Sequence, residues 1–197
     1  MRYKSGRVLR TGDAVSRRTF VGSLGALAVV MYGCKPSAAT LAAPTANKEV
    51  SIEEFSAAGK SLGIVHVAKL VKSAEEWKAQ LSPLAFSVTR KQGTEVPFTG
   101  EYASNHADGL YRCVCCDTAL YDSKTKFESG TGWPSFWQAI SSVNVVKSRD
   151  DSLGMERDEI SCRRCDAHLG HVFDDGPKPT GLRYCMNSVA LHFVARA

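Results

Sequence analysis

The chain has 197 residues, a length that suits one domain with a sizeable core. Its formal net charge of +5 suggests a nucleic-acid partner at first sight, but the charge is concentrated at one end. Residues 1–34 contain six basic residues and one acidic residue, Asp13. The whole chain has 25 basic and 20 acidic residues, so residues 35–197 contain 19 of each. The body is therefore neutral, and we expect no nucleic-acid partner.

The first 43 residues are typical of an export signal with its cleavage region. The segment Ser16–Phe20 resembles the twin-arginine motif of bacterial export, and the apolar run Val21–Gly33 follows it. That run would span about 20 Å as a helix, short of the roughly 30 Å needed to cross a membrane. We therefore expect an exported protein, periplasmic or attached to the outer face of the inner membrane. The alternative is a hydrophobic N-terminal helix packed on the domain.

The position of signal cleavage has two interpretations. The segment Met31–Cys34 loosely resembles a lipobox, in which Cys34 would carry a lipid and provide the protein's contact with the membrane. Cleavage within the small-residue stretch Ser37–Ala46, for example after Ala42 or Ala43, is equally compatible with the sequence.

Residues 44–67 are expected to form an N-terminal linker or extension ahead of the main domain, residues 68–197. The segments Ser51–Glu54 and Ser73–Glu76 both carry the capping-box pattern of a helix start. The second is the stronger prediction, and its helix should end near Pro83.

From Phe86 onward the pattern predicts short antiparallel strands. β-prone runs alternate with clusters of Gly, Pro, Asn and Asp, as in a domain of short strands and tight turns. The predicted fold is mainly β, with two short-stranded antiparallel sheets and a few short N-terminal helices. The runs are Phe86–Thr89, Ala119–Tyr121, Val143–Lys147 and Cys185–Val194.

The last of these runs shows the clearest alternation. If the strand is regular from Arg183, the side chains of Arg183, Cys185 and Asn187 share one face. This arrangement would put a thiol beside a guanidinium group and a side-chain amide.

Two copies of one short motif lie 49 residues apart. Each has the form Cys-x2-Cys-Asp-x-x-Leu, and two such turns (knuckles) predict one tetrahedral zinc site bridging them. Because four thiolates close the coordination shell, the zinc would be structural. Disulfides are the alternative in an oxidising compartment. The predicted ligands are Cys113, Cys116, Cys162 and Cys165, and Cys115 is a spare thiol in the first knuckle.

Cys185 is the thiol that remains once the knuckles are assigned. With His168 and His171 upstream and Arg183 beside it, Cys185 is a candidate nucleophile, and the alternative is a small buried side chain. Because four thiolates already suffice for a metal, we expect the two histidines to line the Cys185 pocket. Trp133 lies in a Gly- and Pro-rich loop, where either core packing or a pocket position fits.

Five blocks in a fixed order resemble methionine-R-sulfoxide reductase B across roughly residues 68–197. The knuckles are interleaved with the blocks as in that family, which makes the combination highly specific. The blocks are Lys72–Trp77, Gly93–Gly100, Ser129–Phe136, His168–Phe173 and Arg183–Ser188.

The resemblance implies a mainly antiparallel β fold whose zinc lies away from the chemistry. It also implies reduction of methionine-R-sulfoxide in proteins, with the free amino acid as an alternative substrate, and without an organic cofactor. The family's nucleophile falls on Cys185, and its pocket residues fall on Trp133, His168, His171 and Asn187, with Arg183 beside the nucleophile.

The recycling step is where the chain departs from many members of the family. Thr131 stands where they carry a resolving cysteine. We expect a thioredoxin-like or other external thiol to reduce the Cys185 sulfenic acid, because the rigid knuckle limits the reach of Cys115, the other candidate. We also expect a monomer. The rival functions are a non-catalytic zinc-ribbon binding module and a thiol oxidoreductase acting on disulfides.

Overall fold

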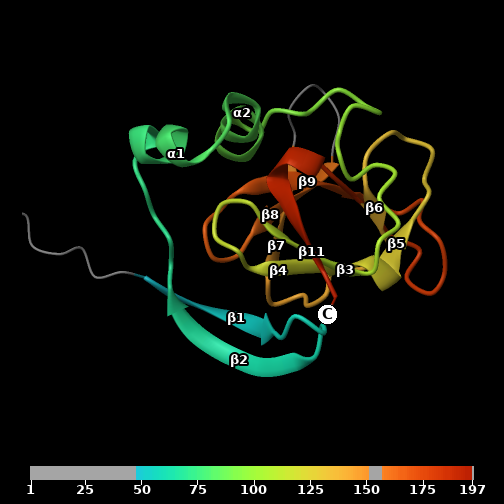
Figure 1. Ribbon diagram of the computed structural model, residues 1–197, viewed down its shortest axis with the longest axis horizontal. Helices are drawn as coiled ribbons and strands as arrows, with labels where there is room; N and C mark the ends of the chain where they lie inside the picture. Colours follow the sequence, from blue (N-terminus) through green and yellow to red (C-terminus); the bar gives the residue numbers. More distant parts are fainter. Residues whose placement is uncertain (1–47, 151–156, 197) are drawn as a thin grey trace, which may run out of the picture. The chain divides into compact units, whose positions relative to one another are not determined.

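The computed structural model describes residues 48–150 and 157–196 (Figure 1). The predicted export signal, its cleavage region and Cys34 lie outside the described residues. Within these two ranges, no helix is both long and apolar enough to cross a membrane.

The described chain is mainly β, with two short helices near its start (Figure 1). The helices are α1 (Ala74–Gln80) and α2 (Pro83–Lys91). The first strands are β1 (Glu49–Phe55), β2 (Ser61–Ala68), β3 (Gly109–Cys113), β4 (Ala119–Asp122), β5 (Lys126–Phe127) and β6 (Ser135–Phe136). The others are β7 (Val145–Asp150), β8 (Arg157–Cys162), β9 (His168–Phe173), β10 (Arg183–Met186) and β11 (Leu191–Ala195).

The strands form antiparallel sheets, as predicted. A six-stranded sheet has the order β5-β6-β10-β9-β8-β7, and a three-stranded sheet has the order β11-β3-β4. The ring of Tyr121 on β4 stacks on that of Phe136 on β6 at 4.4 Å between centroids, so aromatic side chains join the two sheets in one core. A third sheet, the hairpin β1-β2, was not predicted.

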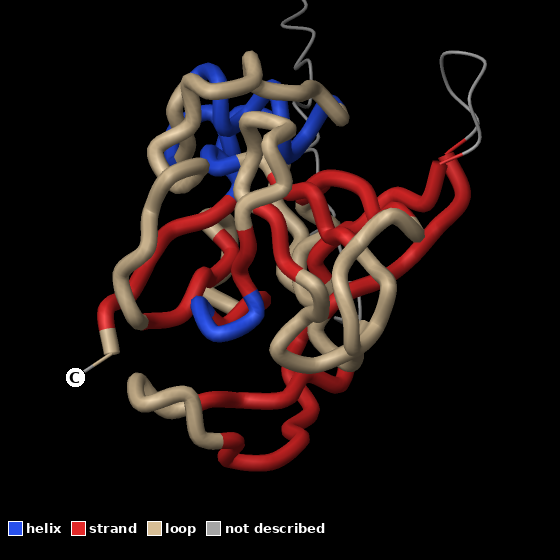
Figure 2. Tube along the Cα trace, turned by 90° about the vertical axis from the view of Figure 1, so that its right-hand side faces the viewer, coloured by secondary structure: helices blue, strands red, loops and turns tan. Residues whose placement is uncertain are grey.

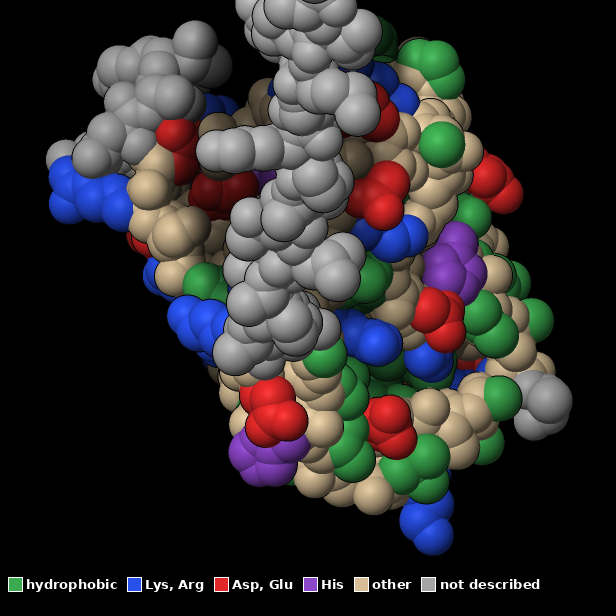
Figure 3. All heavy atoms as spheres, turned by 90° about the vertical axis from the view of Figure 1, so that its left-hand side faces the viewer, with side chains coloured by type: hydrophobic (Ala, Val, Ile, Leu, Met, Phe, Trp, Pro, Cys, Tyr) green, Lys and Arg blue, Asp and Glu red, His purple; other side chains and the backbone are tan. Residues whose placement is uncertain are grey.

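The helices and the hairpin lie at opposite ends of the two larger sheets in both ribbon and tube views (Figures 1 and 2). On the face shown in Figure 3, basic and acidic side chains are interspersed wherever the described surface is visible. This distribution agrees with the neutral balance of charge outside the leader.

Helix α1 begins at the predicted capping box. The Ser73 hydroxyl accepts a hydrogen bond from the Glu76 N–H at 3.2 Å, and the Glu76 carboxylate accepts one from the Ser73 N–H at 2.7 Å. The strand predicted at Phe86–Thr89 is wrong, because these residues lie in α2. Ser82 caps that helix and Pro83 occupies its first turn, and these local signals prevail over a four-residue β-prone run.

Residues 49–68 form the hairpin, so the helix start predicted at Ser51 is also wrong. Contacts with residues distant in the sequence favour strands over a helix in this segment. The fully buried side-chain amide of Asn144 accepts a hydrogen bond from the Glu53 N–H at 2.7 Å and donates one to the Glu53 carbonyl at 2.8 Å. Ile52 is buried beside this contact.

The predicted strand from Cys185 to Val194 is interrupted. Strand β10 ends at Met186, and a short 3-10 turn, Ser188–Ala190, carries the chain into β11 in the other sheet. The buried Glu95 carboxylate accepts hydrogen bonds from the backbone N–H groups of Ser188 at 2.7 Å and Val189 at 3.1 Å. Only Arg183 and Cys185 of the predicted face therefore belong to one regular strand.

Candidate active site and metal centre

The two knuckles have the same backbone geometry. The Asp117 N–H donates to the Cys113 carbonyl at 2.8 Å, and the Asp166 N–H donates to the Cys162 carbonyl at 2.9 Å. Both aspartates have left-handed φ values, 62° and 53°, which Asp tolerates better than most residues. The sequence repeat is thus a structural repeat.

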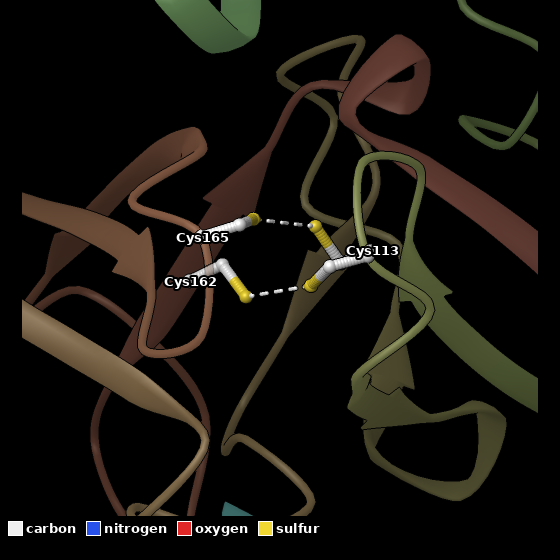
Figure 4. Close-up of side chains that lie close together, drawn as sticks. Cys113, Cys162 and Cys165 are labelled. Carbon is white, nitrogen blue, oxygen red and sulfur yellow. Dashed lines mark hydrogen bonds between the residues drawn. The ribbon is translucent and has the colours of Figure 1, made fainter. Parts of the chain in front are cut away.

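The knuckles bring four sulfur atoms together (Figure 4). Sγ of Cys113 lies 3.7 Å from Sγ of Cys165, Sγ of Cys116 lies 3.5 Å from Sγ of Cys162, and all four lie within 4.8 Å of one another. A tetrahedron with Zn–S bonds of about 2.3 Å requires sulfurs about 3.8 Å apart, whereas a disulfide requires about 2.05 Å. The four thiols are therefore positioned to bind a metal ion, and none of the six cysteines in the described ranges is in a disulfide.

Cys115 is buried next to the four-sulfur cluster. Its thiol neighbours those of Cys113 and Cys165, and its carbonyl accepts a hydrogen bond from the Gln80 side chain at 3.0 Å. The Cys185 sulfur has a different neighbour, the Thr131 hydroxyl. The two thiols occupy different environments.

A second group of predicted residues surrounds a pocket of about 190 Å³. This volume is smaller than the roughly 300–1,000 Å³ of sites that take drug-sized ligands, and it suits one side chain. Four predicted residues, Cys185, Trp133, His171 and Asn187, line it together with Thr94, Arg157, Gly170, Phe173 and Met186.

Cys185 is on β10, between His171 of β9 and Ser135 of β6 in the sheet register. Its Sγ lies 3.8 Å from Oγ1 of Thr131. Burial raises the pKa of the Cys185 thiol, and this effect outweighs the lowering by Thr131, by the charge of Arg183 and by Ser135. Arg183 by itself favours the thiolate, but the net shift of the Cys185 pKa is upward.

Arg183 is held in place from two sides. Its Nε and Nη2 donate to the two carboxylate oxygens of Asp175, both at 2.8 Å, and its guanidinium lies 4.3 Å from the ring centroid of Phe173. This clamp positions the charge beside Cys185.

His171 belongs to a hydrogen-bonded chain with Asp150 and Arg157 that was not predicted. Its Nε2 lies 2.8 Å from Oδ2 of Asp150, and the same oxygen accepts a hydrogen bond from Nη2 of Arg157 at 2.9 Å. Asp150 and Arg157 face each other across the β7-β8 ladder. No short motif relates them to His171, so only the sheet register reveals the arrangement.

A bulge in β9 brings the two histidines onto one side. Gly170 pairs with Ile160 of β8 while His168 pairs with the next residue, so Leu169 is the extra residue. The imidazole rings lie 5.3 Å apart, edge to face. Gly170 has a φ of 155°, and a Cβ there would lie 2.1 Å from the Cys185 carbonyl oxygen, so only glycine fits between β9 and β10.

His168 itself does not line the pocket. It is buried, with Nδ1 2.7 Å from Oε1 of Glu159 on β8. Burial lowers the pKa of His168 more than Glu159 raises it, so the imidazole is neutral at pH 7. His168 is connected to the site through its ring contact with His171.

Glu95 connects Trp133 to Asn187. The Trp133 indole N–H donates to the Glu95 carbonyl at 3.1 Å, and the Glu95 N–H donates to the Asn187 side-chain oxygen at 2.9 Å. The Asn187 amide also donates to the Leu169 carbonyl at 3.1 Å, which leaves one of its N–H groups for the pocket. Glu95 lies in the Gly93–Gly100 block but was given no role, because its contacts are 38 and 92 residues away.

An antiparallel β domain with a paired-knuckle metal centre and a half-buried thiol in a small pocket is the architecture of a thiol-dependent enzyme. Residues 81–195 match the model of the SelR domain. The chain is 56% identical over 128 residues to peptide methionine sulfoxide reductase MsrB of Pseudomonas entomophila, covering 65% of this chain and 98% of that protein. It is also 56% identical over 121 residues to the protein of that name from Thioalkalivibrio sulfidiphilus, covering 61% and 88%. The chain therefore belongs to the SelR domain family of MsrB peptide methionine sulfoxide reductases.

Proposed function

We propose that the protein reduces the R epimer of methionine sulfoxide to methionine, with Cys185 as the nucleophile. The observation that carries this proposal is the position of the Cys185 sulfur in one pocket with Trp133, His171 and Asn187. Membership of the family supports the reaction, since the relatives are peptide methionine sulfoxide reductases.

The pocket residues suggest how the substrate is held. The indole of Trp133, fixed by its hydrogen bond to Glu95, offers an aromatic face for the S-methyl group. His171 and the remaining N–H of Asn187 are donors for the sulfoxide oxygen, directly or through water. This arrangement would leave the sulfur open to Cys185.

The chemical step is a two-electron transfer between sulfur atoms. The Cys185 thiolate attacks the sulfoxide sulfur and forms an S–S bond while a proton reaches the sulfoxide oxygen. The hydroxyl group then passes to the Cys185 sulfur as the S–S bond and the methionine S–O bond break, so methionine leaves and Cys185 is left as a sulfenic acid. Because burial raises the pKa of Cys185, we infer that its proton leaves when substrate binds, with His171 as the neighbouring group able to relay it.

An external dithiol would complete the cycle. One thiol attacks the sulfenic sulfur and releases water, and the second reduces the mixed disulfide. Resolution by Cys115 is the alternative, but Cys115 is buried beside the metal ligands and shares no neighbour with Cys185. We favour a thioredoxin-like donor.

The metal is proposed to be one zinc ion. Four soft thiolates at tetrahedral spacing are a set that zinc prefers, and their closed shell gives the ion a structural role. The twin-arginine-like leader supports export to the periplasm, where oxidised proteins would be the substrates.

Turnover of separated R and S sulfoxide epimers, with dithiothreitol and with thioredoxin, tests the proposal. We expect reduction of the R epimer alone, and complete loss in Cys185→Ser with zinc content retained. Turnover by Cys185→Ser would exclude this nucleophile. No turnover by wild type with intact zinc would favour a non-catalytic zinc-ribbon module.

Mass spectrometry after one turnover without reductant distinguishes the recycling routes. A sulfenic acid on Cys185, trapped with dimedone, is expected. A Cys115–Cys185 disulfide would instead establish Cys115 as the resolving thiol.

A further inference from the structure

Two apolar side chains are exposed beside the pocket. Val96 is 66% exposed and Phe98 is 72% exposed. Both lie in the loop that lines the pocket with Thr94 and holds the Trp133 indole through the Glu95 carbonyl. Exposed apolar groups that adjoin a binding pocket mark a surface for a partner more often than scattered ones do.

Phe98 is held in this exposed position by its backbone. Its φ of 64° is in the left-handed region, which a bulky residue adopts rarely and at a cost. The Phe98 N–H donates to the Gly132 carbonyl at 2.8 Å, and a Cβ on Gly132 would lie 2.7 Å from the Phe98 ring. The ring therefore rests on the backbone directly before Trp133.

The size of the pocket indicates which part of a polypeptide substrate would lie over the Phe98 ring. A volume of about 190 Å³ takes one side chain, so the rest of a polypeptide substrate stays outside. The residues next to the methionine sulfoxide then lie over the rim of the pocket. Apolar neighbours would remove the exposed Val96 and Phe98 side chains from water.

We propose that Val96 and Phe98 form a docking surface for the residues flanking methionine sulfoxide in an oxidised polypeptide. The inference rests on the proposed function and extends it: sulfoxides with apolar neighbours are preferred over those with polar neighbours or none. Both side chains adjoin residues that hold the pocket wall, Glu95 and Gly132 next to Trp133, which is why we assign them to the substrate rather than to the reductant.

The test compares three R-sulfoxide substrates, with dithiothreitol as reductant. They are N-acetyl-methionine sulfoxide, a peptide with leucines flanking the sulfoxide, and the same peptide with serines. Phe98→Asn removes the ring while keeping a residue that tolerates a left-handed backbone. Val96→Thr keeps shape but adds polarity, and Val71→Thr, at a position 79% exposed, is the matched control.

We expect wild type to have a higher kcat/KM for the leucine peptide than for the serine peptide. In Phe98→Asn the ratio of kcat/KM for the leucine peptide to that for N-acetyl-methionine sulfoxide should fall about fivefold to tenfold, the loss of about 1 kcal/mol of apolar contact. Val96→Thr should lower it less, and Val71→Thr should leave it unchanged.

An unchanged ratio in both Phe98→Asn and Val96→Thr would overturn the inference. So would a defect seen only when thioredoxin replaces dithiothreitol, because the surface would then serve the reductant. Wild type that reduces none of the three R-sulfoxide substrates would refute the proposed function itself, a result distinct from an unchanged ratio.

Discussion

The Asp150 carboxylate lies 2.8 Å from Nε2 of His171, the histidine that lines the pocket beside Cys185. A carboxylate at this distance favours a proton on Nε2, so Nδ1 is the nitrogen able to take the Cys185 proton and then donate it to the sulfoxide oxygen. Arg157 bonds the same carboxylate oxygen and fixes its position. We therefore expect the aspartate to set the orientation and tautomer of His171.

Asp150→Asn is therefore expected to lower kcat for the R-sulfoxide about tenfold to a hundredfold with a much smaller change in KM, because the acid is misoriented while the pocket is intact. The ¹⁵N chemical shifts of His171 report the tautomer directly and should change. Asp150→Glu should restore part of kcat. Asp158→Asn, which removes a more exposed carboxylate paired with Lys147, is the control and should match wild type. Equal kcat in Asp150→Asn and wild type would show that the contact has no catalytic role.

Features specified by short-range patterns were predicted from the sequence. The capping box at Ser73 and the paired knuckles depend on residues within a few positions of one another, and the structure contains both. Residue type and spacing picked out Cys185 and the two histidines, and strand alternation picked out Asn187, although only Arg183 and Cys185 belong to one regular strand. The family resemblance added the pocket role of Trp133.

Features specified by distant contacts were missed. Asp150 and His171 are brought together by the pairing of β7, β8 and β9. Glu95 ends β10 by accepting a hydrogen bond from the turn that follows Asn187. The hairpin β1-β2 is held by Asn144, 91 residues away from Glu53 in the sequence. The Asn144 side chain accepts a hydrogen bond from the Glu53 N–H and donates one to the Glu53 carbonyl. No local propensity contains such information, because the partners are brought together by the fold.

The resting state of Cys185 has a measurable pH dependence. Because burial raises its pKa above the ordinary value, the thiol form dominates at neutral pH, and the thiolate fraction should still be rising at pH 9. The rate of Cys185 alkylation by iodoacetamide, followed by peptide mass spectrometry, should therefore increase up to and beyond that pH. Arg183→Gln removes a charge that lowers the pKa, so alkylation at pH 8 should slow severalfold. A rate that is constant above pH 7 would contradict the dominance of burial.

The adjacent cysteines Cys115 and Cys116 provide a matched pair for the metal centre. Only Cys116 belongs to the four-sulfur cluster. Cys116→Ser should lower bound zinc, measured by mass spectrometry of the metal, from one ion per chain toward zero, and should lower the thermal midpoint by about 10 °C or more, because metal binding stabilises the fold by several kcal/mol. Cys115→Ser should retain one ion. Loss of zinc in Cys115→Ser with retention in Cys116→Ser would reverse the ligand assignment.

The hairpin contact at Asn144 is expected to contribute to stability rather than to catalysis. Its buried amide bonds both backbone groups of Glu53 and the carbonyl of Ala119, the last at 2.8 Å, so Asn144→Ala leaves buried backbone groups without partners. The free energy of unfolding in urea should fall by about 2–4 kcal/mol, since each unsatisfied group costs about 1–3 kcal/mol. Hydrogen exchange should show the largest loss of protection in β1 and β2. Asn105→Ala, whose side chain accepts a hydrogen bond from the Ala107 N–H and takes no part in the hairpin contact, is the control, and an equal loss of stability there would argue against a specific role for the Asn144 contact.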